Sequence, residues 1–120
     1  MSGQNLRMTR DITKSGATAG VPKLILAAQS ITSRTFEYWR VGYDRRKMTF
    51  LPDGRVGEGA AGCEVFWWLR MNEGHVVLEI LSGTEVTCRM KQDSDETWRG
   101  RWTHHEKMGV VLCPPSDAAY

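Results

Sequence analysis

Residues 50–80 read FLPDGRVGEGAAGCEVFWWLRMNEGHVVLEI, and this stretch decides the fold. Its apolar runs are interrupted by Pro-Asp-Gly at 52–54 and by Asn-Glu-Gly at 72–74. An Asp-Gly pair between apolar residues favours a hairpin with a type I′ turn, in which both central residues have positive φ. The stretch therefore predicts short strands joined by tight turns.

Residues 63–71 separate into two sets, because successive side chains of a strand point to opposite faces. One set is wholly apolar and should reach a core: Cys63, Val65, Trp67, Leu69 and Met71. The other set should face outward: Glu64, Phe66, Trp68 and Arg70. Two aromatic side chains on the outside of a sheet often mark a protein interface. Phe66 and Trp68 are therefore candidates for a homodimer contact or for contact with a protein partner.

The same alternation recurs along residues 33–115, with no helical pattern between the apolar runs. The predicted strands cover 35–43, 47–51, 55–58, 63–71, 75–81, 85–91, 97–105 and 108–113, and polar turns are predicted at 44–46 and 93–96. Pro114 and Pro115 should end the last strand, because proline cannot donate to a ladder. About eight short strands at this spacing predict an all-β domain, an antiparallel up-and-down meander that closes into a small barrel. A curved open sheet is the alternative.

The two ends of the chain differ from this domain. Residues 1–32 are mostly polar and lack a sustained period, which predicts a flexible segment. Pro22 could open a short helix over residues 23–29 that caps an open end of the barrel. Residues 116–120 are expected to form a tail.

Composition bounds the function. A chain of 120 residues with 41% apolar and 25% charged residues is typical of one globular domain. A net charge of +2 makes nucleic acid an unlikely partner, and no apolar run is long enough for a membrane helix. The three widely spaced cysteines favour buried thiols in a reducing compartment, so the expected location is cytoplasmic.

The strand 98–102, WRGRW, carries the most suggestive pattern. Aromatic rings and guanidinium groups could together stack a sugar or base and hold a phosphate or carboxylate. The alternation instead places Trp98 and Trp102 in the core and Arg99 and Arg101 outside, where they should pair with acids on a neighbouring strand. Gly100 could relieve crowding or open a small pocket beside the rings.

An interior ligand site is the other candidate. Its expected lining is aromatic, with two further residues near the mouth of the barrel: Trp39, Trp67, Trp98 and Trp102, with Tyr38 and Arg40. A core filled by side chains is favoured for so small a barrel. The basic cluster at 45–47 could meet RNA or an acidic partner, but the small net charge favours a solvated turn.

Nothing in the sequence points to catalysis, a metal or a cofactor. There is no G-x-S-x-G or H-E-x-x-H motif and no closely spaced cysteine pair. His104 and His105 are adjacent and would point to opposite faces of a strand. The acidic residues at 93–96 lack the rest of a calcium loop.

The FLPDGRV hairpin, the E-x-x-W pair Glu64 and Trp67, the VVLEI strand and the WRGRW strand resemble small calycin-like, lipocalin-like barrels. They are also similar to β-rich accessory segments beside bacterial sugar- and methyl-transfer enzymes. The resemblance spans roughly residues 35–113, without the long helix and long loops of full lipocalins. It implies binding rather than catalysis: a non-enzymatic module for a small apolar or sugar-like ligand, or alternatively an accessory domain that uses Phe66 and Trp68.

Overall fold

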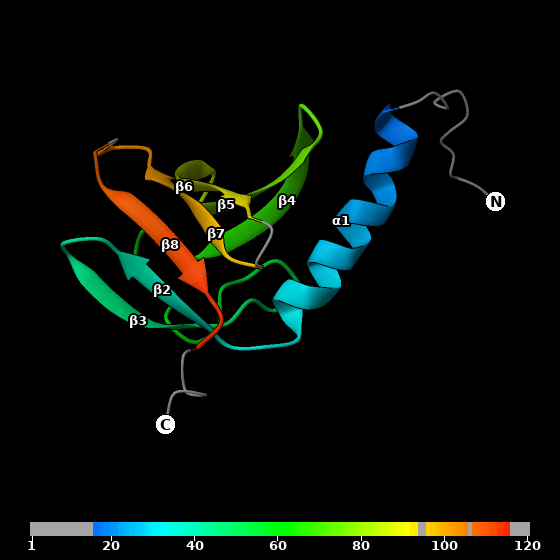
Figure 1. The fold of residues 1–120 in the computed structure, drawn as a ribbon. Coiled ribbons are helices and arrows are strands. Elements are labelled where there is room, and N and C mark those ends of the chain that lie inside the picture. Colours follow the sequence, from blue (N-terminus) through cyan, green and yellow to red (C-terminus); the bar gives the residue numbers. More distant parts are fainter. Residues whose placement is uncertain (1–15, 94–95, 106, 116–120) are drawn as a thin grey trace.

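The computed structural model describes residues 16–93, 96–105 and 107–115, with side chains described from Gly20 onward. One helix precedes seven strands (Figure 1). The elements are α1 (Gly16–Thr32), β2 (Phe36–Arg40), β3 (Asp44–Met48), β4 (Phe66–Asn72), β5 (His75–Ser82), β6 (Glu85–Gln92), β7 (Trp98–Trp102) and β8 (Gly109–Cys113).

All seven strands form one antiparallel sheet in the order β3-β2-β8-β7-β6-β5-β4. Strands β4 to β8 form a meander, and the β2–β3 hairpin is added beside β8. The sheet bends strongly, with α1 along one side next to β4 (Figure 1). The predicted antiparallel sheet is confirmed, but the predicted closed barrel is wrong, because β3 and β4 end the sheet and do not pair with each other.

The segment 49–65 between β3 and β4 explains why the sheet stays open. It makes only isolated bridges, such as Phe50 with Val56 and Arg55 with Phe66, so the predicted strand at 55–58 does not form. Four glycines in this segment weaken regular pairing. The expected turn at 52–54 is present, with Gly54 N–H donating to the Leu51 carbonyl at 3.0 Å. Among the described residues, Glu73 and Gly74 are the two central residues of a turn that both have positive φ. The type I′ geometry predicted for the turn at 52–54 is therefore found at 73–74 instead.

The predicted polar turn at 44–46 is wrong, because these residues begin β3. The chain reverses one step earlier, around Gly42, whose φ is +82°. Asp44 and Arg46 form ion pairs, so their polarity does not interrupt the strand.

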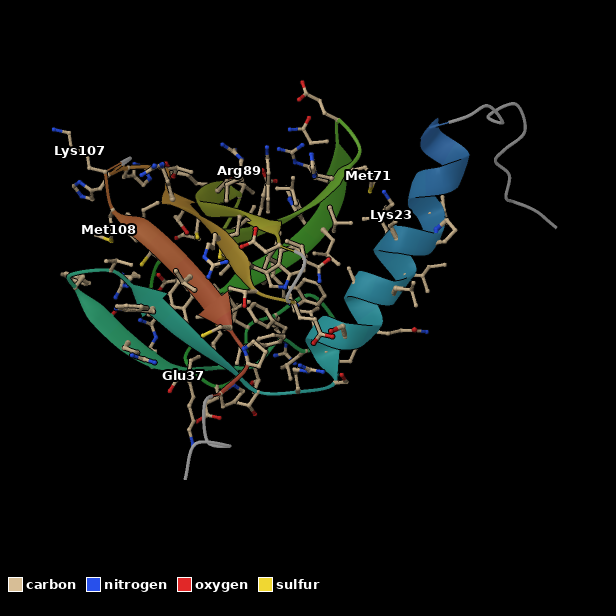
Figure 2. All side chains as sticks on the ribbon, viewed as in Figure 1. Lys23, Glu37, Met71, Arg89, Lys107 and Met108 are labelled. Carbon is tan, nitrogen blue, oxygen red and sulfur yellow. The ribbon has the colours of Figure 1, made fainter. Side chains whose placement is uncertain are left out.

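Helix α1 is longer than the predicted short helix, since it begins at Gly16 and contains Pro22. Residues 16–32 are therefore helical rather than flexible, while residues 1–15 and the predicted tail at 116–120 lie outside the described residues. Ala27 and Ile31, one turn apart, are buried in the core. In Figure 2, Met71 on β4 faces α1, where it packs against Gly20. No helix in the described part of the chain is long and apolar enough to cross a membrane.

The concave face of the sheet holds one hydrophobic core. The period-two prediction is confirmed here, because Trp67, Leu78, Met90 and Trp102 come from four strands and join the same cluster. The other large members include Phe36, Tyr38, Met48, Phe50, Ile80, Trp98 and Leu112. The outer face carries mostly polar and aromatic side chains, apart from the buried Val77 and Leu81 of β5.

Candidate functional site

The structure divides the predicted interior site between two faces. Tyr38 and Trp98 are buried, with exposed fractions of 0% and 2%. Trp67 and Trp102 are partly buried against the core, and Arg40 lies on the same face as Tyr38. Trp39 lies on the opposite, outer face, where 38% of it is exposed. The other five residues lie on the concave face of the sheet, among packed side chains. Trp39 therefore cannot share a site with them.

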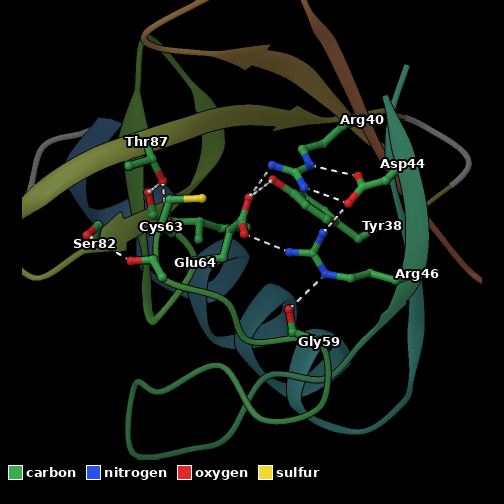
Figure 3. Close-up of polar contacts among 11 residues, drawn as sticks. Tyr38, Arg40, Asp44, Arg46, Gly59, Cys63, Glu64, Ser82 and Thr87 are labelled. Atoms are coloured by element: carbon green, nitrogen blue, oxygen red, sulfur yellow. Dashed lines mark hydrogen bonds and ion pairs between the residues drawn. The ribbon is translucent and has the colours of Figure 1, made fainter. Parts of the chain in front are cut away.

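A buried ionic cluster occupies one end of this interior (Figure 3). The Glu64 carboxylate is fully buried and accepts hydrogen bonds from Tyr38 Oη at 3.2 Å and from Arg46 Nη2 at 2.6 Å. Arg40 lies 3.4 Å from the same carboxylate and donates twice to Asp44, at 2.7 and 2.5 Å. Arg46 also donates to Asp44, at 2.8 Å. Two guanidinium groups are therefore balanced by two carboxylates.

The cluster also fixes protonation states. Burial, together with Cys88 and Glu64, raises the pKa of Tyr38. Burial raises the pKa of the Cys88 thiol to about 12, so it is a protonated core residue and not a nucleophile at neutral pH. Hydrogen bonds from Arg40 lower the pKa of Asp44. These properties describe a structural centre in which each charge already has a protein partner.

The sequence pattern missed this cluster because it assigned Glu64 to the outward set. Residues 61 and 64 form a tight bridge just before β4, with backbone hydrogen bonds of 3.1 and 3.0 Å. The alternation of β4 begins only at Phe66, so it does not extend back to Glu64.

The outer face of β6 and β7 carries four basic side chains on two adjacent strands. Arg89 lies directly opposite Arg101, and Lys91 lies directly opposite Arg99. The residues directly opposite Arg99 and Arg101 on β6 are therefore basic rather than acidic. Like charges placed directly across a sheet are destabilising. Arg99 pairs with Asp93 in the loop between β6 and β7, and Arg89 pairs with Glu79 on β5.

These side chains line an open groove of about 1080 Å³, which we call the basic groove. Lys107 contributes a fifth basic side chain, and Figure 2 shows it and Arg89 on the outside of the sheet. The single carboxylate in the lining, Glu85, bonds His104 at 2.9 Å. The sequence contains the basic residues of this groove at alternate positions of both strands. The groove could not be predicted from it, because the sequence does not show the register that places these residues opposite one another.

Glu79 separates the basic groove from the outward aromatics of β4. Its carboxylate accepts hydrogen bonds from Trp68 Nε1 at 2.6 Å, Arg70 at 3.0 Å and Arg89 at 2.6 Å. Burial raises the pKa of Glu79, but the hydrogen bonds from Arg70, Arg89 and Trp68 outweigh it and lower the pKa to about 2. The folded state therefore stabilises the ionised form of Glu79.

This pKa shift predicts a pH dependence of stability. Because the folded pKa is about 2 and the ordinary value is 4.5, the stabilisation is present above that value and is lost as the pH falls through the folded pKa. We expect Glu79→Gln to lower the free energy of unfolding by about 2 kcal/mol at pH 7. In urea unfolding, this difference should shrink between about pH 5 and pH 2. Glu73→Gln, at an exposed position, is the control, and a difference that does not change with pH would contradict the assignment.

Phe66 and Trp68 are exposed, as predicted, with exposed fractions of 39% and 50%. Together with Leu81 they line a second groove of about 490 Å³. Ile25 on α1 is also 52% exposed. The homodimer or protein partner expected at this surface stays a prediction.

His104 and His105 follow the end of β7, so they do not alternate as strand residues. Both rings instead contact Trp102, with centroid distances of 6.0 and 5.8 Å. Within the described residues, no three His, Cys, Asp or Glu side chains are grouped to hold a metal ion.

Comparisons with known proteins found no match: no protein-family model, no curated protein and no solved structure is detectably similar to this chain. The resemblance to calycin-like barrels and accessory domains therefore stays a prediction, and the function is argued from the molecule itself.

Proposed function

We propose that this protein is a non-enzymatic binding module whose ligand is an anion held in the basic groove of β6 and β7. The observation that carries the proposal is the pair of like-charge oppositions, Arg89 with Arg101 and Lys91 with Arg99. Two of these four cations also have a carboxylate partner, because Arg89 pairs with Glu79 on β5 and Arg99 pairs with Asp93. Four cations in two adjacent cross-strand pairs repel one another, and an anionic ligand would relieve that repulsion.

The lining indicates the chemistry of the ligand. Guanidinium groups match phosphate and carboxylate oxygens with two parallel hydrogen bonds, and lysine adds a mobile point charge. The groove, at about 1080 Å³, is at the upper end of the size of small-molecule sites. A ligand with several phosphate groups fits both properties better than the small apolar or sugar-like ligand expected from the sequence.

The proposal keeps the binding role predicted from the sequence, but it places the ligand on the outer face of the sheet instead of among the interior aromatic residues. The interior aromatics, including Tyr38 and Trp98, are packed in the core, and the buried charges are already paired. The calycin-like resemblance supports the same class of role, binding rather than catalysis. Cys63 and Cys88 are thiols, which supports a location in a reducing compartment such as the cytoplasm.

Isothermal titration with inorganic tripolyphosphate tests the proposal. We expect wild-type protein to bind it and the double variant Lys91→Gln/Arg99→Gln to bind about 10-fold more weakly or worse, because two charge-assisted contacts are lost. The double variant should be about as stable as wild type, since it removes a like-charge pair together with one exposed ion pair, that of Arg99 with Asp93.

The control removes two exposed basic side chains outside the groove, Arg55 and Lys47, by changing both to Gln. Its affinity for tripolyphosphate should stay within about two-fold of wild type, because salt screens the attraction between the ligand and exposed charges outside the groove. No binding by wild-type protein, or an equal loss in the control, would reject the proposed function.

A further inference from the structure

Resting on this proposed function, we infer that the anion is the backbone of a single-stranded nucleic acid, whose bases stack on Trp39. The inference starts from one row of the outer face that crosses five strands. Each residue of the row lies directly opposite the next: Lys91, Arg99, Val111, Trp39 and Arg45. Along this row, Val111 alone separates Arg99 of the basic groove from the exposed Trp39.

Trp39 has the properties of a stacking platform. It is 38% exposed on the outer face of β2, and the guanidinium of Arg45 lies 5.0 Å from the centre of its ring. Arg45 is in turn held by Glu37 at 2.7 Å. Trp39 is two strands from Arg99, or roughly 10 Å at the usual strand spacing. A short segment of nucleic acid could therefore place phosphates in the groove and a base on the ring.

The combination of cations and an aromatic face selects among polyanions. Duplex DNA and sulfated polysaccharides offer negative charge, but neither offers an unstacked base. Single strands bind to sheets that combine a basic track with aromatic side chains, and each stacked base contributes strongly to affinity. The net charge of +2 does not oppose this, because five basic side chains gather in the groove, against three carboxylates in or beside it: Glu79, Glu85 and Asp93.

Fluorescence anisotropy with labelled dT12 and rU12 tests the inference. We expect Trp39→Ala to weaken binding about 10-fold, with tripolyphosphate affinity unchanged. Phe66→Ala is the matched control, since Phe66 is also exposed on the outer face, at 39%, but lies on β4, away from the row. Trp39→Phe keeps an aromatic ring and should retain the stacking. Trp39→Leu keeps an apolar side chain without a π face and should lose it. Circular dichroism of each variant confirms folding.

Salt dependence gives an independent readout. The logarithm of the dT12 binding constant should fall linearly with the logarithm of salt concentration, and Lys91→Gln should reduce the slope by about 0.7. Equal affinity for dT12, a blunt duplex and heparin, or an unchanged affinity in Trp39→Leu, would overturn the nucleic-acid inference while tripolyphosphate binding keeps the proposed function. Failure of tripolyphosphate itself to bind would remove both.

Discussion

Replacing Glu64 by glutamine is expected to lower the free energy of unfolding by about 3 kcal/mol, because it removes one carboxylate from a buried group of charges. Arg46 donates to this carboxylate at 2.6 Å, and Arg40 lies 3.4 Å from it. With Glu64 neutral, two guanidinium groups would share Asp44 alone. For a domain of this size the melting temperature should fall by about 10 °C, measured by circular dichroism.

Glu58→Gln provides the matched control, because Glu58 belongs to the same segment but is exposed. Its stability should stay within about 0.5 kcal/mol of wild type. A Glu64→Gln variant as stable as this control would mean that the carboxylate is solvated in solution, and that the cluster does not hold segment 49–65 against the sheet.

Gly100→Ala is expected to cost about 3 kcal/mol by overpacking. A β-carbon at this position would overlap the carbonyl oxygen of Arg89 and lie 2.7 Å from Met90 Cα, so β6 and β7 would have to separate. Gly100 lies opposite Met90, between the two like-charge pairs of the basic groove. Urea unfolding should show the loss directly, and the groove should lose affinity for tripolyphosphate as its strands move apart.

The control for this substitution is Gly62→Ala. A β-carbon there would meet no heavy atom within 4 Å, and Gly62 does not have positive φ. The substitution should be neutral within about 0.5 kcal/mol. If Gly100→Ala were equally neutral, the close approach of β6 and β7 described above would be wrong.

The strands could be predicted from alternation because most of them have one buried face. On β2, Phe36 and Tyr38 are buried while Trp39 is exposed, and the inward assignment of Trp67 and Trp102 is confirmed by their packing. Gly100 does relieve crowding, but against the backbone of β6 at Arg89 and Met90 rather than beside the tryptophan rings. These inferences succeeded because a period of two residues is a local property of the chain.

Closure and polar pairing could not be predicted in the same way, because both depend on contacts between distant segments. Asp44 and Arg46 resemble turn residues until Glu64, far along the chain, provides a buried partner. The like-charge pairs of the basic groove depend equally on the register between β6 and β7, which the sequence does not show. Helix α1 was underestimated because its stability depends on burying Ala27 and Ile31 against the sheet.

The central claim is that this protein binds an anion on the outer face of β6 and β7 rather than inside the sheet. A titration with tripolyphosphate, followed by the backbone amide resonances in ¹H–¹⁵N NMR spectra, tests it most directly. We predict that the largest shifts belong to Glu85–Gln92 and Trp98–Trp102. Shifts centred on Tyr38, Arg40 and Trp67, or an absence of shifts at millimolar tripolyphosphate, would contradict the claim.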